Sequence, residues 1–222
     1  MFKTDYRYTN REEKGKYVWL KYQSILSGAK ILDVGADQCY LREYLDEKTS
    51  YWGIGLGGNP DQQVNLEKEP LPFPNNHFDC VLCLDVLEHL DNIHQAFDEL
   101  CRVTKQYVIL SLPNPYANLW SRLRFGDYRP GISLKFYGLP LEPPEDRHKW
   151  FFSWEEAEKF VVYRAAKNKM KVLQIDCESV GGEGGGRRGW LRTIARNYLL
   201  RRDLNLKNLY YGTLWSILRK DQ

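Results

Sequence analysis

The stretch KILDVGADQC, residues 30–39, decides the fold class. It begins with a short, mostly apolar run that ends at a glycine, as a buried strand ends at a tight turn, and apolar residues at helical spacing follow it. The same alternation of strand and helix signals continues along the chain, with strands predicted at 51–56, 64–66, 80–84 and 107–112 and an amphipathic helix at 90–103. Apolar strands that alternate with helices indicate a doubly wound, mostly parallel α/β sheet covered on both faces.

The second half of the chain is less regular. Residues 113–152 are rich in proline and aromatic side chains and too long for a plain connection, so we interpret them as a lid or substrate-binding insertion. A capping box at 153–156 predicts a helix to about residue 168, followed by strands at 171–177 and 209–219. The remaining insertion, 181–206, combines a glycine-rich hinge with a basic helix at 190–202.

Composition limits the possible classes of protein. A length of 222 residues favours one domain with insertions, and 43% apolar with 27% charged residues argues against a disordered or coiled-coil chain. A net charge of +3 is too weak for a dedicated nucleic-acid binder, although residues 187–222 carry nine Lys or Arg against two Asp or Glu. Because the start is polar and no apolar run approaches the roughly 18 residues of a membrane span, we expect a soluble, cytoplasmic protein.

The cysteine and histidine spacings do not predict a metal site. Cys80 and Cys83 form a C-x-x-C pair, but they lie on a predicted buried strand, where residues three apart point to opposite faces. We therefore expect core thiols. His89 and His94 are five residues apart, so they do not form the pair of helical ligands that a spacing of four would give.

The turn after the first strand is the first place to look for a ligand, since doubly wound sheets bind ligands at the carboxyl ends of their strands. Gly35 permits close approach of the backbone, but Asp37 and Cys39 stand where a dinucleotide-binding turn would have glycines. A pyrophosphate would meet a carboxylate there. The turn suits a cationic or hydroxyl-bearing ligand better.

Three segments in this order are typical of one family: ILDVG at 31–35, LPFPNNHFD at 71–79 and DVLEHL at 85–90. With them, residues 29–114 resemble the class I S-adenosylmethionine-dependent methyltransferases, in particular the small-molecule group of the methyltransferase type 11 kind. The resemblance implies a Rossmann-like, seven-stranded sheet, S-adenosylmethionine as cofactor and methyl transfer (EC 2.1.1) as the reaction.

The resemblance also implies a set of cofactor-binding residues. In this chain they are Asp33, Gly35, Ala36, Asp37, Gly55, Leu56, Asn65, Leu66, Leu84, Asp85 and Val86. Gly55 is a departure, because the family usually has an acidic residue there that accepts both ribose hydroxyls. Its loss should weaken cofactor affinity by about 1–3 kcal/mol unless a residue such as Asp61 replaces it.

Methyl transfer to a hydroxyl needs an aligned acceptor, a dry site and a base. His148, among charges and aromatic rings in the predicted lid, is our first candidate for the base, and His89, just after the fourth main strand, is the second. The alternatives are a surface residue for His148 and a helix-start residue satisfied by the backbone for His89. We expect the acceptor to be a small molecule or glycoconjugate.

The basic helix has several interpretations. Arg188, Arg192 and Arg196 form one stripe that could contact an anionic membrane surface or a phosphorylated carrier, or could be only a solvated face. An RNA methyltransferase that uses this segment is a further hypothesis, and a degenerate, cofactor-free scaffold is another, motivated by Asp37, Cys39 and Gly55. The sequence has no feature that determines the acceptor or the oligomeric state.

Overall fold

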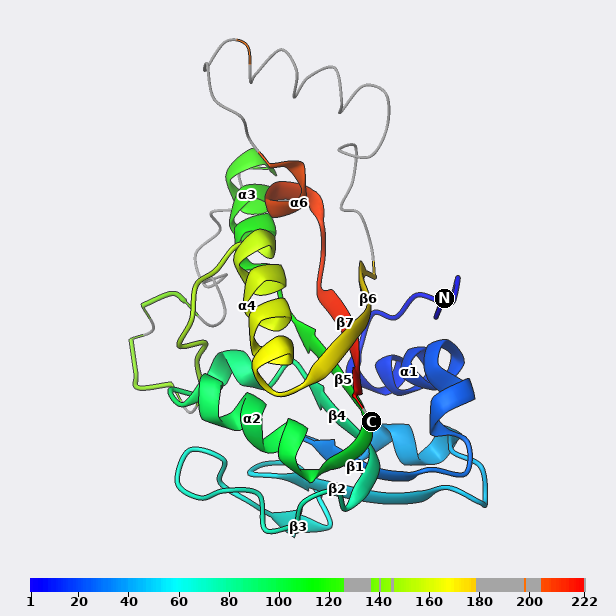
Figure 1. Ribbon diagram of the computed structural model, residues 1–222. Helices are drawn as coiled ribbons and strands as arrows, with labels where there is room; N and C mark the ends of the chain where they lie inside the picture. The colour runs from blue at the N-terminus through cyan, green and yellow to red at the C-terminus, as the bar shows by residue number, and fades with distance from the viewer. Residues whose placement is uncertain (126–136, 140, 145, 179–197, 199–204, 222) are drawn as a thin grey trace.

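Seven strands form one sheet in the computed structural model, in the order β3-β2-β1-β4-β5-β7-β6 (Figure 1). The structure describes all residues except 126–136, 140, 145, 179–197, 199–204 and 222. The strands are β1 (Lys30–Val34), β2 (Ser50–Gly55), β3 (Gln62–Gln63), β4 (Phe78–Leu84), β5 (Thr104–Leu112), β6 (Met170–Cys177) and β7 (Leu214–Lys220). Neighbouring strands from β3 to β5 are parallel, and β7 is antiparallel to both β5 and β6. The predicted mostly parallel, seven-stranded sheet is confirmed.

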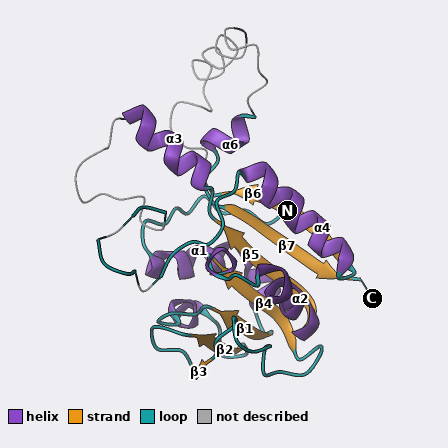
Figure 2. Ribbon diagram, turned by 90° about the vertical axis from the view of Figure 1, so that its left-hand side faces the viewer, coloured by secondary structure: helices purple, strands orange, loops and turns teal. Residues whose placement is uncertain are grey.

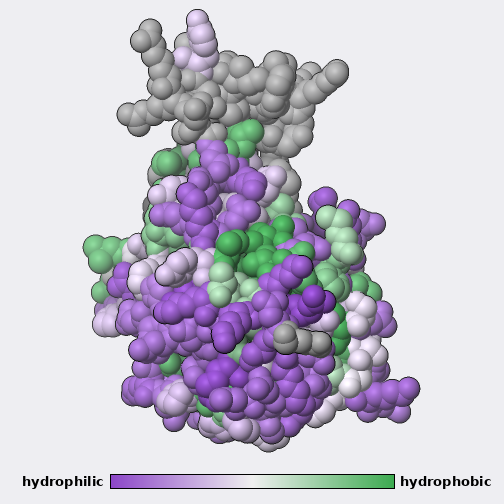
Figure 3. Space-filling view, viewed as in Figure 1, coloured by the Kyte–Doolittle hydropathy of each residue, from purple (hydrophilic) through white to green (hydrophobic). Residues whose placement is uncertain are grey.

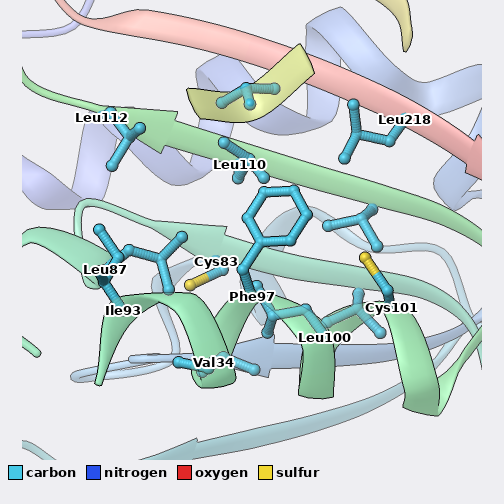
Figure 4. Packing of buried hydrophobic residues seen from close by; sticks show 14 of the residues in the cluster. Val34, Cys83, Leu87, Ile93, Phe97, Leu100, Cys101, Leu110, Leu112 and Leu218 are labelled. Carbon is cyan, nitrogen blue, oxygen red and sulfur yellow. The ribbon is translucent and has the colours of Figure 1, made fainter. Parts of the chain in front are cut away.

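Helices cover both faces of this sheet (Figures 1 and 2). They are α1 (Arg11–Leu26), α2 (Ile93–Val103), α3 (Pro115–Phe125), α4 (Trp154–Lys167) and α6 (Leu206–Tyr210), with short 3-10 turns η1 (Tyr40–Tyr44) and η2 (Leu87–His89). One buried cluster packs α2 and α4 against the sheet, and a second packs α1 against the other face. Figure 4 shows the first cluster, in which the Phe97 ring lies among aliphatic side chains of β5 and α2.

The two cysteines of the C-x-x-C pair lie on opposite faces, as predicted. Cys83 belongs to the cluster under α2 and α4, and Cys80 to the cluster under α1. Both thiols are fully buried, and burial raises the pKa of each well above its usual value. They are core residues and cannot share an ion.

Several predicted boundaries were wrong. The third strand pairs at Gln62–Gln63, not at 64–66, and the final strand begins at Leu214 because the chain first forms α6. Helices α1 and α3 were not predicted at all. The capping box is confirmed, since the Ser153 side chain and Glu156 cap each other's backbone at the start of α4.

Most of the predicted basic insertion, 181–206, lies outside the described residues. The hinge at 181–189, Arg188, Arg192 and Arg196 all lie outside the described residues. Within the described part of the chain, none of the helices combines the length and the apolar character needed to cross a bilayer. The face shown in Figure 3 is mostly hydrophilic, with an apolar patch near its centre and smaller apolar groups at its sides.

Candidate active site

The turns after β1 and β4 are in direct contact. Gly35 has φ +81°, and a Cβ at this position would lie 2.2 Å from Cγ2 of Val86. The N–H groups of Gly35 and Ala36 both donate to the carbonyl of Ile54 in β2, at 2.8 and 3.0 Å. Three segments that the sequence predicts as cofactor-binding, at the ends of β1, β2 and β4, therefore meet at one edge of the sheet.

In the turn after β1, two residues other than glycine have the positive φ angles that glycine usually adopts. Asp37 and Cys39 have φ values of 51° and 57°, in the left-handed region that favours glycine. The carbonyl of Asp37 accepts a hydrogen bond from the N–H of Asn59, at 2.7 Å, which ties the loop after β2 to this turn. Strained backbone of this kind persists where the surroundings enforce it and is concentrated at functional sites.

Helix α1 brings two cations to the same edge, which the sequence reasoning missed. Arg11 pairs with Asp37 at 2.6 Å, and Lys14 pairs with Asp85 at 2.7 Å. Burial alone would raise the pKa of Asp85, but Lys14 and the hydroxyl of Ser111, 2.6 Å away, lower it below its usual value. Asp85 is thus held as a carboxylate beside the turn.

Asp33 is buried two residues before Gly35 and is satisfied by the protein itself. The phenol of Tyr51 donates to its Oδ2 at 2.6 Å. Burial raises the pKa of Asp33 to about 6, although Tyr51, Lys14 and Arg42 each lower it in part.

The predicted ribose site lacks an acid in the structure as well. Around Gly55 there is room for a side chain, since a Cβ there would be 3.6 Å from the nearest atom, Cα of Gly35. Asp61 does not replace the acid in this arrangement, because its carboxylate accepts the N–H of Gly53 at 2.7 Å and pairs with Arg42. Leu56 is 62% exposed and presents an apolar surface beside this position.

The other predicted cofactor residues flank the same strands. Asn65 accepts the N–H of Glu67 with its side chain, and the carbonyl of Leu66 accepts from the Asn92 amide at 2.8 Å. Leu84 ends β4 and is partly buried against the cluster beneath α1. The structure places these residues without testing their roles, so the cofactor contacts stay predictions.

The two candidate bases lie together, with a glutamate that the sequence reasoning did not single out. Nε2 of His89 and Nε2 of His148 are 3.8 and 3.9 Å from Oε1 of Glu88. The rings of the two histidines are 4.5 Å apart between centroids and nearly perpendicular. Glu88 and His89 come from η2, whereas His148 comes from the segment predicted as a lid.

The surroundings of each histidine differ from its structural alternative. His148 is only 9% exposed, so it is not a surface residue. His89 is not satisfied by the backbone alone, because its Nδ1 lies 2.7 Å from a carboxylate oxygen of Asp146. Glu88 is completely buried, and burial, with a smaller contribution from the charge of Asp85, raises the pKa of Glu88 well above its usual value.

The chain matches known sequences over its first half. Residues 32–112 match the family model described as a methyltransferase domain. The ubiquinone/menaquinone biosynthesis C-methyltransferase UbiE of Pseudomonas aeruginosa (strain LESB58) is 35% identical over 71 residues, and that of Pseudomonas putida (strain GB-1) is 37% identical over 71 residues. Each match covers 31% of this chain and 27% of the relative, so it spans about a quarter of these relatives' length.

Solved structures share the whole fold at low sequence identity. A SAM-dependent methyltransferase from Archaeoglobus fulgidus has a TM-score of 0.59 at 16% identity, covering 95% of both chains. Magnesium protoporphyrin IX methyltransferase (ChlM) from Synechocystis PCC 6803, solved with bound SAH, has a TM-score of 0.55 at 15% identity, covering 95% of this chain and 83% of that one. Residues 32–112 thus match a methyltransferase-domain family within a sheet of the topology seen in solved S-adenosylmethionine-dependent methyltransferases, and the resemblance that the motifs predicted is confirmed.

Proposed function

We propose that this protein transfers the methyl group of S-adenosylmethionine to a hydroxyl oxygen of a small molecule or glycoconjugate. The observation that carries the acceptor part of the proposal is the group of Glu88, His89 and His148, in which Glu88 and His148 are buried. Glu88 and His89 follow directly on the turn at Asp85 and Val86, and Val86 packs on Gly35. Groups able to act on a hydroxyl proton thus lie beside the predicted cofactor turn.

The residues at the edge of the sheet fit the cofactor. The turn at 35–39 keeps left-handed conformations at Gly35, Asp37 and Cys39. In the part of the chain that the structure describes, nothing beyond the neighbouring residues lies within 4 Å of a Cβ placed on Gly57. Arg11 and Lys14 supply cations for the carboxylate of the amino-acid end, and Asp37 or Asp85 supplies an anion for its ammonium group. Leu56 and Leu66 offer apolar contacts to the adenine, and Asn65 offers a hydrogen bond.

The cofactor supplies a methyl group bound to a positively charged sulfur. When the methyl group is transferred, the neutral thioether is a good leaving group. The protein has to align the acceptor, exclude water and receive one proton. As an acceptor oxygen forms its bond to the methyl carbon, the electron pair of the carbon–sulfur bond stays on sulfur, and the hydroxyl proton has to leave. In the simplest form of the proposal, Nε2 of His148 receives it, with His89 as the second candidate.

A carbon acceptor is the second candidate function. It is favoured by the match of 71 residues to a protein named as a C-methyltransferase, although that match covers only about a quarter of the relative's length. A phenolic ring methylated on carbon also loses one proton, so the same histidines would serve. The site of methylation on the product distinguishes the two functions.

The test is a screen of phenols, hydroxylated small molecules and glycoconjugates, read out as release of S-adenosylhomocysteine. The position of the new methyl group is then determined by carbon-13 NMR with labelled cofactor. A methoxy product supports the proposal, and a methyl group on ring carbon supports the second candidate instead.

RNA is tested as an acceptor in a separate assay. Methylation of RNA, with salt-dependent RNA binding that is abolished by replacing Arg188, Arg192 and Arg196 with alanine, would overturn the small-molecule proposal.

A further inference from the structure

We propose that Glu88, His89 and His148 bind a divalent transition-metal ion at the end of β4. One carboxylate oxygen and one imidazole nitrogen from each histidine lie within 4.8 Å of one another. The ligands come from two parts of the chain, η2 and the segment after residue 145, which the fold brings together. A site made of two imidazoles and one carboxylate is a set that proteins use for catalytic metal ions, because it leaves positions open.

The distances suit a shared ion. Oε1 of Glu88 is 3.8 Å from Nε2 of His89 and 3.9 Å from Nε2 of His148. Two ligand atoms that are each about 2.1 Å from one ion can be at most about 4.2 Å apart, so both pairs are within reach of a common ion. Only small side-chain movements are needed to bring all three atoms to bonding distance.

Each histidine has a partner on its other ring nitrogen. Nδ1 of His89 lies 2.7 Å from Oδ1 of Asp146, and Nδ1 of His148 lies 2.9 Å from the phenol oxygen of Tyr137. These contacts turn both Nε2 atoms toward Glu88. Metal-binding histidines are oriented in this way, by a carboxylate or another polar group on the nitrogen that does not bind the ion.

Glu88 is a second, independent indication of a ligand. Its side chain is completely buried, and among the residues that the structure describes neither of its carboxylate oxygens has a hydrogen bond. Burying a carboxylate without hydrogen bonds is costly, and coordination of a cation is one of the few arrangements that compensates for it. A bound ion would account for the position of this side chain.

The segment that carries His148 is fixed to the rest of the site. The N–H of Lys149 donates to the carbonyl of Glu88 at 2.9 Å, and the indole N–H of Trp150 donates to the carbonyl of Leu90 at 2.7 Å. The ammonium group of Lys149 also pairs with Glu67 and Asp91, at 2.6 and 2.7 Å. The three ligands are therefore held near one another before any ion binds.

The donor set indicates the kind of ion. Imidazole nitrogen suits Zn²⁺, Fe²⁺ and related transition metals, whereas Mg²⁺ and Ca²⁺ prefer oxygen ligands throughout. We therefore expect Zn²⁺, Co²⁺ or Mn²⁺ to bind and Ca²⁺ to bind far more weakly.

The role of the ion rests on the proposed function. A divalent ion beside the cofactor turn would take the acceptor oxygen at an open position and lower the pKa of its hydroxyl group. With both Nε2 atoms committed to the ion, the hydroxyl proton leaves to bulk water, and the oxygen lone pair forms the bond to carbon while the carbon–sulfur electron pair goes to sulfur. The ion is neither oxidised nor reduced.

The test measures binding directly, on tag-free protein stripped with EDTA and dialysed. Isothermal titration with Zn²⁺ and Mn²⁺, and visible absorption during titration with Co²⁺, should show one ion per chain. Glu88→Gln and His148→Asn should each weaken binding at least tenfold. His77→Asn is the matched control, since His77 contacts Lys30 outside the cluster, and it should bind as the wild type does.

A further variant distinguishes loss of the metal site from unfolding of the protein. Asp146 is 58% exposed, so Asp146→Asn should leave the circular dichroism spectrum and melting temperature unchanged and still weaken the ion about 10–100-fold through His89. Wild-type protein that binds none of the three ions below 1 mM would overturn the proposal. Undiminished binding by folded Glu88→Gln and His148→Asn would overturn it too, because the ion would then sit elsewhere.

Metal binding and methyl transfer can be measured independently on the same protein. Metal binding is measured without acceptor or cofactor, so it can succeed even where no methyl transfer is found. If O-methyl transfer is found, loss of activity with EDTA and recovery with Zn²⁺ or Mn²⁺ supports the role of the ion. Full activity in EDTA would overturn that role and would leave His148 as the proposed acceptor of the hydroxyl proton.

Discussion

Gly35 and Val86 lie so close that a single methyl group on Gly35 would approach Cγ2 of Val86 to 2.2 Å. Gly35 also has φ +81°, which a side chain makes unfavourable. We therefore expect Gly35→Ala to lower the free energy of unfolding by about 2–4 kcal/mol and to weaken cofactor binding, because relief of the clash must separate the two turns. Urea unfolding and titration with S-adenosylmethionine measure the two effects.

Gly57→Ala is the matched control for that variant. Among the described residues, and apart from the two neighbours of Gly57 in the chain, no atom lies within 4 Å of a Cβ on Gly57. Its φ is not in the left-handed region, so both stability and affinity should remain within error of wild type. Equal losses in the two variants would show that the contact between Gly35 and Val86 has no special importance.

Restoring an acid at position 55 should strengthen cofactor binding. The backbone of Gly55 has no positive φ, and the nearest atom to its Cβ would be 3.6 Å away, so Gly55→Asp is tolerated sterically. If the ribose lies there, a bidentate carboxylate should tighten affinity by about 1–3 kcal/mol, or roughly 10–100-fold. Gly55→Ala should leave it unchanged, and a Gly55→Asp protein with weaker binding would place the ribose elsewhere.

Asp33 should make stability fall as pH rises. Its pKa, about 6 in the folded protein against an ordinary 3.8, means that the native state holds this proton over a pH range where the unfolded chain has lost it. Between about pH 4 and pH 6, this one group should reduce the free energy of unfolding by about 2–3 kcal/mol. Urea unfolding across that range, compared with Asp33→Asn, isolates the contribution, and identical pH slopes for both proteins would refute it.

The pair of Lys21 and Asp176 should be a large single contribution to stability. The Lys21 side chain is 2% exposed, its pKa is lowered by burial, and its ammonium group lies 2.6 Å from Asp176. Asp176→Asn leaves that cation buried beside a neutral partner and should cost about 2–4 kcal/mol of unfolding free energy.

Two variants check this interpretation. Adding Lys21→Met to Asp176→Asn should recover part of the loss, because the buried charge is then gone. Lys159→Met breaks an exposed pair with Glu155 and should change stability by about 0.5 kcal/mol or less. An Asp176→Asn protein as stable as wild type would contradict the buried-charge argument.

The central strands were predictable because their apolar runs are short and end at turn residues. β1 is observed at Lys30–Val34, as predicted, and β4 and β5 differ only by a few residues at their starts. Helix α1 was missed because half of its residues are charged or polar and its buried face includes Gly15 and Lys21. Its N-terminal signal was nevertheless present, since the Asn10 side chain caps the N–H of Glu13 in the same way that Ser153 caps α4.

The candidate site was only half visible in the sequence. The motif at 85–90 marked His89, and the aromatic and charged surroundings marked His148, but nothing in their spacing of 59 residues shows that both face Glu88. A glutamate next to a histidine reads as an ordinary polar pair until its burial is known. The cations Arg11 and Lys14 were missed for the same reason, because only the fold brings α1 to the end of β1 and β4.

Titration of the purified protein with S-adenosylmethionine by calorimetry tests most directly whether the edge formed by the turns at Gly35 and Val86 is a cofactor site. We predict one site per chain with a dissociation constant in the micromolar range, weakened in Gly35→Ala and unchanged in Gly57→Ala. Absence of binding heat at millimolar cofactor, from a folded protein, would contradict the account and favour a scaffold that has kept only the fold.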